Sequence, residues 1–194
     1  VSGSSRRRRS IRRIGSKSNI STTENTVDEE EMAYPQPILS DVNIHVSRGE
    51  LCAVVGKVAS GKSTLCEAIL NEAVLGEHSH VTLNGTVAYV SQTAWILNKT
   101  LRDNILFGLP YDESRYNTVI YCCCLRHDIN MLGEDGDMTE IGERGINLSG
   151  GQKQRISLAR AAYSDASVYI FDDPLSALVS CVLYHLCIRC KYVS

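Results

Sequence analysis

Residues 56–63 have the sequence Gly56-Lys57-Val58-Ala59-Ser60-Gly61-Lys62-Ser63, which fits the pattern G-x-x-x-x-G-K-[ST]. The run before it, residues 51–55, is continuously apolar and predicts a strand buried on both faces. The run after it, residues 62–70, carries apolar residues at helical spacing. A strand, a glycine-rich loop and a helix are the context in which this pattern binds phosphates. The stretch therefore predicts a nucleotide-binding phosphate loop in an α/β fold.

The chemistry of this predicted loop depends on backbone amides and on one cation. Glycines allow successive N–H groups to turn toward phosphate oxygens, and the N-terminus of the following helix adds partial positive charge. Lys62 is placed to neutralise the β- and γ-phosphates, and the hydroxyl of Ser63 is placed to bind Mg²⁺. The alternative is a glycine-rich turn that binds no ligand. The predicted nucleotide-binding residues are Gly56, Lys57, Val58, Ala59, Ser60, Gly61, Lys62, Ser63 and Thr64.

A second apolar run, residues 168–171, ends in the carboxylates Asp172 and Asp173 and predicts another buried strand. Ligands gather at the carboxyl ends of parallel strands. We therefore predict that Asp172 belongs to the Mg²⁺ shell, and that Asp173 is the base that orients the attacking water. The alternative is a solvated turn after the strand, but the presence of Lys62 in the same chain favours the functional interpretation.

A third motif, Leu148-Ser149-Gly150-Gly151-Gln152, lies between the two halves of the predicted site. Together with residues 89–96 around Gln92 and with residues 175–177, it gives the order of motifs seen in ATP-binding cassette (ABC) transporters. From about Pro37 to Ala177 the chain resembles the nucleotide-binding domain of that family. The resemblance implies a P-loop NTPase sheet with an inserted helical subdomain and a small antiparallel β part near residues 42–90.

Three further segments resemble the C family of these transporters, the multidrug-resistance-associated group, and the first of its two nucleotide-binding domains. They are residues 93–96, 104–108 and 140–147. Residues 172–177 are also similar to that group, with Asp173 where most family members carry Glu. Asp is shorter by one methylene, roughly 1.5 Å, and general-base catalysis requires hydrogen-bond reach to the water. We therefore predict that this site binds ATP and hydrolyses it slowly.

The resemblance also implies roles for residues outside the phosphate loop. Gln92 would contact Mg²⁺ and the attacking water, and an aromatic residue, for which Tyr34 is our choice, would stack on adenine. The signature residues Leu148, Ser149, Gly150, Gly151 and Gln152 would serve an ATP bound to a second nucleotide-binding domain, because the family pairs two such domains head to tail. Residues 142–145 and the Gln92 region would face the transmembrane domains.

The chain is predicted to have three parts. Residues 1–32 hold a basic block followed by an acidic one, with few apolar residues, and predict a disordered linker. Residues 33–178 form the predicted nucleotide-binding domain, with its helical subdomain at about 99–145. Within that subdomain, Thr100 is expected to cap a helix over residues 101–107, and Asp112 is expected to cap a helix through Leu125. Residues 179–194 form a divergent tail that resembles nothing in the family. The 43% hydrophobic content is sufficient for a core, and a net charge of −2 identifies no partner.

The resemblance ends after Leu178, where Val179 stands in place of the family's Asp. The family's next strand and its switch histidine are expected beyond this point, and His185 lies too close to Asp173 to be that histidine. Because that strand normally lies between the phosphate-loop strand and the strand at 168–171, its loss would leave backbone groups on both neighbours unpaired. We therefore expect a C-terminally incomplete fold, from truncation, alternative splicing or a gene-model artefact.

The predicted function is ATP binding and hydrolysis for a C-family exporter, with ATP and Mg²⁺ as cofactors. The predicted partners are a second nucleotide-binding domain and transmembrane domains, but no nucleic acid, at the cytoplasmic face of a membrane. A non-hydrolysing regulatory module and a non-functional truncated fragment are the alternatives. A chromosome-maintenance ATPase is discounted, because only 87 positions and no heptads separate Lys62 from Ser149.

Overall fold

The computed structural model describes residues 37–143 and 147–173. Contacts divide the chain into two units, Val1–Gln36 and Pro37–Ser194, and the first of these lies wholly outside the described residues. The predicted linker at 1–32 and the tail at 179–194 are therefore not described.

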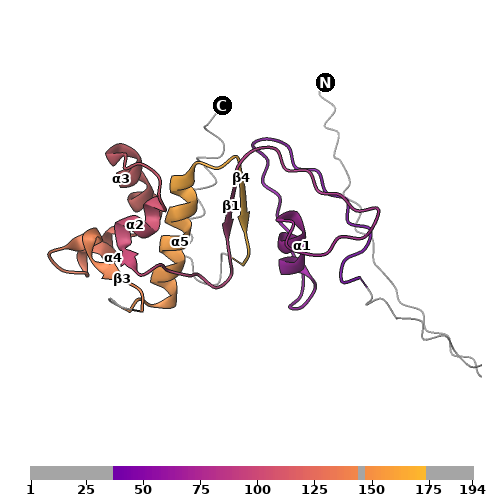
Figure 1. The fold of residues 1–194 in the computed structure, drawn as a ribbon. Helices are drawn as coiled ribbons and strands as arrows, with labels where there is room; N and C mark the ends of the chain where they lie inside the picture. The colour runs from indigo at the N-terminus through magenta and orange to yellow at the C-terminus, as the bar shows by residue number, and fades with distance from the viewer. Residues whose placement is uncertain (1–36, 144–146, 174–194) are drawn as a thin grey trace, which may run out of the picture. The chain divides into compact units, whose positions relative to one another are not determined.

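Two short sheets are present in the described residues. Strand β1 (Val87–Val90) pairs in parallel with β4 (Val168–Phe171), and strand β2 (Lys99–Thr100) pairs antiparallel with β3 (Glu140–Ile141). The strand predicted at 168–171 is thus confirmed. The register aligns the carboxyl ends of β1 and β4, so the residues that follow both strands lie at one edge of the sheet (Figure 1).

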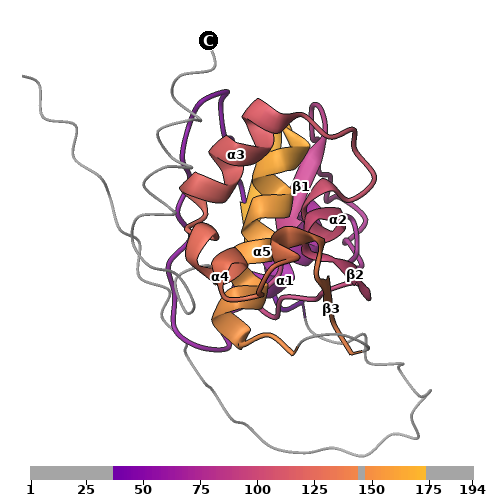
Figure 2. The ribbon, with the colours of Figure 1, turned by 90° about the vertical axis from the view of Figure 1, so that its left-hand side faces the viewer.

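Helix α5 lies between the β1–β4 pair and helices α2 and α3 (Figures 1 and 2). Among the described helices, none combines the length and the apolar character needed to cross a membrane. The helices are α1 (Lys62–Ile69), α2 (Leu101–Leu106), α3 (Glu113–Cys122), α4 (Arg126–Asn130) and α5 (Gly150–Ser164), with a 3-10 turn at Gly136–Met138.

Local sequence signals determine where α2 and α3 begin. The Thr100 hydroxyl accepts the Asp103 amide at 3.0 Å, and the Asp112 carboxylate accepts the Arg115 amide at 2.7 Å. Both predicted N-caps are confirmed. The predicted helix ends are wrong: α2 ends one residue before Phe107, and the helix starting after Asp112 ends at Cys122 instead of continuing to residue 125. A left-handed residue follows each helix, at Phe107 (φ 46°) and at Cys124 (φ 55°).

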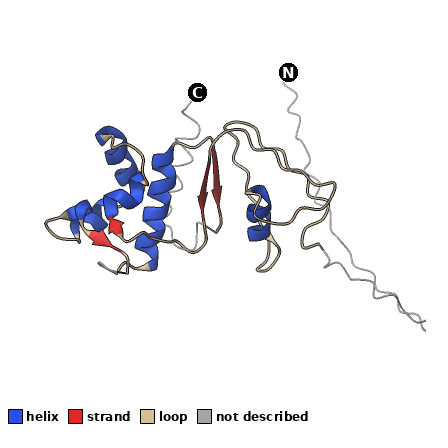
Figure 3. Cartoon of the chain, viewed as in Figure 1, coloured by secondary structure: helices blue, strands red, loops and turns tan. Residues whose placement is uncertain are grey.

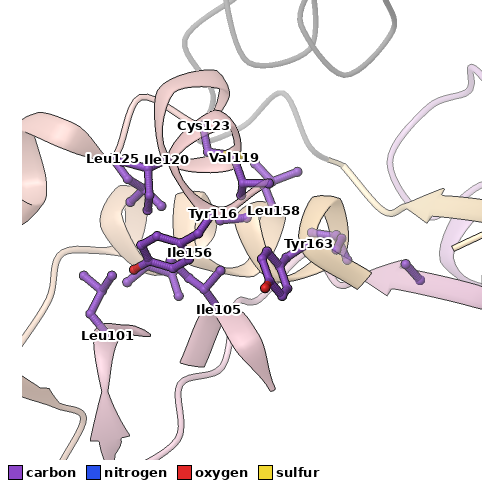
Figure 4. Packing of buried hydrophobic residues seen from close by; sticks show 14 of the residues in the cluster. Leu101, Ile105, Tyr116, Val119, Ile120, Cys123, Leu125, Ile156, Leu158 and Tyr163 are labelled. Carbon is purple, nitrogen blue, oxygen red and sulfur yellow. The ribbon is translucent and has the colours of Figure 1, made fainter. Parts of the chain in front are cut away.

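The hydrophobic core is formed by buried faces of β1, α2, α3 and α5 (Figure 4). The largest fully buried side chain is Tyr163 of α5. Helix α1 contributes no buried residue. The core side chains labelled in Figure 4 are Leu101, Ile105, Tyr116, Val119, Ile120, Cys123, Leu125, Ile156, Leu158 and Tyr163.

The strand predicted at residues 51–55 is wrong for this structure. Residues 37–61 and 71–86 contain no strand, and long loops connect α1 to β1 (Figure 3). Leu51 is 76% exposed and Val55 is 93% exposed. A strand requires a neighbour for its N–H and C=O groups, and within the described residues nothing pairs with 51–55. The antiparallel β part expected near 42–90 is likewise absent from them: only β1 forms there, and it pairs in parallel.

Candidate functional site

The phosphate-loop motif leads directly into helix α1, as its sequence predicts. Gly61 is the N-cap of α1 and has φ 86°, a left-handed conformation that favours glycine. A Cβ atom at Gly61 would also approach the Leu39 side chain to 2.9 Å. The amide of Leu65 donates to the Gly61 carbonyl at 2.9 Å and closes the first helical turn. The left-handed backbone therefore favours glycine here, and a side chain would in addition require the Leu39 methyl group to move.

The Lys62 ammonium turns back over the loop that precedes it. Nζ donates to the carbonyl oxygens of Gly56 at 3.0 Å and of Lys57 at 2.7 Å. A cation held over a loop of this kind neutralises an anion that approaches the same backbone.

Two predicted Mg²⁺ ligands, Ser63 and Asp172, meet where α1 begins and β4 ends. The Ser63 hydroxyl donates to the Asp172 carboxylate at 3.1 Å, although 109 positions separate them in the chain. Adjacent ligands of an octahedral Mg²⁺ ion with bonds of 2.0–2.1 Å lie about 3.0 Å apart. Hydroxyl and carboxylate oxygens are also the hard donors that Mg²⁺ prefers. The pair Ser63 and Asp172 therefore fits this ion in both spacing and donor type.

The ends of β1 and β4 bring a second predicted pair together. The Gln92 side-chain amide donates to the Asp173 carboxylate at 3.5 Å, and the Asp172 amide donates to the Val90 carbonyl at 2.9 Å. Parallel pairing of Val90 with Phe171 explains the meeting, because both polar residues follow directly on the paired ends. Asp173 has φ 46°, a left-handed backbone at the end of the strand.

Asp172 also changes the titration of its neighbours on α1 and β1. Burial, followed by the negative charge of Asp172, raises the pKa of the Cys66 thiol. The same two causes, in the same order, raise the pKa of the Tyr89 phenol. Both groups are therefore kept neutral beside the carboxylate.

The signature segment (residues 148–152) forms the start of α5. Ser149 and Gln152 make a capping box: the Ser149 hydroxyl accepts the Gln152 amide at 3.3 Å, and the Gln152 side-chain oxygen accepts the Ser149 amide at 2.9 Å. Nothing lies within 4 Å of a Cβ built on Gly150. Within the described part of the chain, no acceptor is found for the N–H groups of Gly150 and Gly151. N–H groups of this kind at the start of a helix favour an anionic ligand.

A family model described as ABC transporter matches residues 39–176, which contain all of these motifs. The chain belongs to the ABC transporter family. The matched residues include the phosphate loop, the pair Ser63 and Asp172, and the signature segment. Domains of this family bind ATP.

Curated relatives place the similarity within the C family, or multidrug-resistance-associated group. ATP-binding cassette sub-family C member 2 of Mus musculus is 56% identical over 148 residues, which are 76% of this chain and 10% of that protein. ABC transporter C family member 3 of Dictyostelium discoideum is 54% identical over 78% of this chain and 11% of its own length. Multidrug resistance protein mrp-7 of Caenorhabditis elegans is 54% identical over 80% of this chain and 10% of its own length. The chain thus spans about a tenth of the length of these relatives.

Several predicted residues lie outside the described part of the chain. They are Tyr34, the coupling residues Arg144 and Gly145, the residues at 175–177, and His185.

Sequence reasoning missed several buried polar residues that support the site. The Gln154 amide donates to the Ser91 carbonyl at 3.3 Å and so ties α5 to the segment that carries Gln92. Asn104 is fully buried and bonds to the backbone of residues 97–100. Asp128 is 5% exposed and pairs with Arg155. Polar residues inside helical patterns give a sequence reader no sign of such long-range partners.

Proposed function

We propose that this chain is the ATP-binding and ATP-hydrolysing domain of a C-family ABC transporter that powers export across a membrane. The observation that carries the proposal is the Ser63–Asp172 contact of 3.1 Å at the open edge of the β1–β4 sheet, next to Lys62 of the phosphate loop. In this assignment the loop holds the phosphates of ATP, and Ser63, Asp172 and Gln92 hold Mg²⁺. The domain acts at the cytoplasmic face of the membrane.

The proposed assembly pairs this domain head to tail with a second nucleotide-binding domain, and both dock on transmembrane domains. The signature segment then contributes to the ATP held by the partner domain, while this domain's own ATP requires the partner's signature. Support comes from the position of the signature segment at the N-terminus of α5, whose positive end favours a phosphate. ATP binding closes the pair, and hydrolysis reopens it.

Nucleotide binding is tested with a fluorescent ATP analogue and Mg²⁺ on the full chain. The variant Lys62→Ala is expected to weaken binding at least tenfold, because it removes the cation that faces the loop. Lys99→Ala is the control: it removes a lysine of strand β2, outside the predicted nucleotide-binding residues, and should leave the affinity unchanged. Thermal melting verifies that both variants fold. Equal affinity of the Lys62→Ala variant and the wild type would exclude the proposed phosphate site.

We further propose that hydrolysis at this site is slow, because Asp173 stands where most family members carry Glu. In the structure its carboxylate is only at the limit of hydrogen bonding to Gln92, at 3.5 Å. The variant Asp173→Glu in the intact two-domain transporter is expected to raise the single-turnover rate, since well-placed general bases contribute about 10²–10⁴-fold. An unchanged single-turnover rate in Asp173→Glu would contradict the proposal that Asp173 makes hydrolysis slow.

A non-hydrolysing regulatory module is the second candidate, and the short side chain of Asp173 favours it. The two functions differ in one outcome: a regulatory module traps nucleotide without releasing phosphate. A non-functional fragment would instead show neither a cooperative melting transition nor binding that depends on Lys62.

A further inference from the structure

The N-terminus of α5 is attached to helix α4 by a buried carboxylate. Asp128, in α4, is 5% exposed and accepts two bonds from Arg155, from Nε at 2.7 Å and from Nη2 at 2.8 Å. It accepts a third bond from the Gln152 side-chain amide at 3.3 Å. Gln152 and Arg155 are three positions apart and therefore project from the same face of α5. The pairing also raises the pKa of the Arg155 guanidinium, which stays charged.

The Asp128 carboxylate determines which way the Gln152 amide points. An ionised carboxylate only accepts hydrogen bonds, so it can contact the NH₂ end of the amide and not the oxygen. The Gln152 oxygen is thereby left to face Ser149, whose backbone N–H donates to it at 2.9 Å. One carboxylate on a neighbouring helix thus fixes the orientation of the capping box at the start of α5.

The capping box in turn determines what the signature segment offers to a ligand. The Ser149 hydroxyl oxygen accepts the Gln152 amide at 3.3 Å, so the hydroxyl proton is not used in that bond and can be donated outward. Gly150 and Gly151 follow it as the first residues of α5, and the first N–H groups of a helix have no partner within the helix. A shift of the Gln152 side chain would therefore release the Ser149 amide and loosen the backbone that leads into Gly150 and Gly151.

We propose that Asp128 is a positioning residue that acts through Gln152 to hold Ser149, Gly150 and Gly151 in the geometry that receives the phosphates of ATP on a partner domain. This inference rests on the proposed function for the identity of the ligand. The positioning itself is a property of this chain and can be measured without a partner.

The test measures hydrogen exchange of the Ser149 amide with water by NMR on the full chain. Asp128→Ala is expected to accelerate this exchange on the order of fivefold, the effect of losing one capping bond. Gln152→Met removes the side-chain oxygen that accepts the Ser149 amide, so this variant gives the exchange rate of Ser149 without that bond. The amide of Leu158 reports whether α5 stays intact. Asp137→Ala is the matched control, because Asp137 forms a similar two-bond pair with Arg102 at 2.9 and 3.0 Å.

A second variant separates positioning from stability. In Asp128→Leu/Arg155→Met an apolar pair replaces the ion pair, an exchange that is often neutral or stabilising for folding. If Asp128 positions Gln152, this variant melts near the wild-type temperature but keeps fast Ser149 exchange. Unchanged exchange in Asp128→Ala, or slow exchange restored by the apolar pair, would overturn the proposal.

Sedimentation of the full chain with Mg²⁺ and ATP tests the link to the proposed function. Asp128→Ala is expected to weaken ATP-dependent association severalfold while affinity for the ATP analogue is unchanged, and Asp137→Ala should change neither. If the wild type itself fails to associate with ATP, the proposed role of the signature segment is contradicted. In that case the hydrogen exchange of the Ser149 amide still tests whether Asp128 positions Gln152.

Discussion

The Arg160 guanidinium is a cation inside the protein that has no carboxylate beside it in the described residues. It donates to the Asn104 carbonyl at 2.8 Å and to the Asn104 side-chain oxygen at 3.2 Å. Its carbon lies 4.0 Å from the ring centre of Trp95 and 5.1 Å from that of Phe107. Burial lowers the pKa of Arg160 to about 10. It therefore stays charged at neutral pH, stabilised by carbonyl oxygens and aromatic faces.

Arg160→Ala is expected to lower the free energy of unfolding by about 2–4 kcal/mol, through lost charged hydrogen bonds and lost packing. Arg115→Ala is the matched control, because Arg115 also lies over an aromatic ring but pairs with the exposed Asp165. Arg115→Ala should lower the free energy of unfolding by less than about 1 kcal/mol. Urea denaturation measures both, and equal losses would contradict the importance of the buried contacts.

Cys66 gives a residue-scale test of the charge on Asp172. Burial is the main cause of its raised pKa, and Asp172 is the next. A raised pKa reduces the thiolate fraction at any given pH, so Asp172→Asn should lower the pKa and speed alkylation of Cys66 at pH 8. The alkylation rate of the Cys66 peptide, followed by mass spectrometry, should rise about twofold or more. Glu113→Gln is the control and should leave the rate unchanged.

At the scale of elements, long-range hydrogen bonds hold the turns that connect the helices. The Tyr163 hydroxyl, on α5, donates to the Pro110 carbonyl at 2.6 Å and accepts the Asp112 amide at 2.8 Å. One buried hydroxyl thus fixes the turn that leads into α3. Asn104 does the same for the segment between β1 and α2, with four bonds to the backbone of residues 97–100.

Tyr163→Phe is expected to destabilise the protein by about 1–3 kcal/mol, because the Asp112 amide and the Pro110 carbonyl lose the partly buried bonds to the Tyr163 hydroxyl. Tyr111→Phe removes a hydroxyl from an exposed tyrosine in the same turn and should cost less than about 0.5 kcal/mol. Thermal or urea unfolding gives both values. A similar loss in the two variants would mean that the buried hydroxyl carries no special role.

The helix starts were predictable and the helix ends were not, for a physical reason. Thr100, Asp112 and Ser149 cap helices through bonds that span three positions, so the sequence contains the whole signal. Helix α2 ends at Leu106 and α3 at Cys122, and the left-handed residues that follow them, Phe107 and Cys124, do not favour that conformation. Packing of the following segment selects those conformations.

For the whole molecule, burial is unevenly distributed. The core residues come from β1 and the segments from 101 to 163, whereas Leu51, Val55 and Val58 of the segment around the phosphate loop are at least 76% exposed. The described residues supply no strand to pair with 51–55 or to cover these side chains. The loop's contacts with the rest of the chain depend on few bonds, of which Ser63 to Asp172 is one.

Amide hydrogen exchange is therefore expected to divide the chain. The amides of residues 51–55 should exchange within the mixing time, whereas those of Val90, Leu158 and Phe171 should be protected by at least about 100-fold, because exchange from them requires opening of the core. Mass spectrometry of peptic fragments measures this difference. Protection of 51–55 comparable to that of β4 would show that the segment is paired in solution.

The sequence by itself determined the motifs, their order and several of the elements that carry them. The phosphate loop before α1, the strand β4 and the cap of α5 depend on neighbouring residues, so local patterns identify them. Only the tertiary structure decided which residues meet. The contacts of Ser63 with Asp172 and of Asp128 with Gln152 join segments 109 and 24 positions apart. It also decided that residues 51–55 form no strand, because an apolar run becomes a strand only when another strand pairs with its backbone.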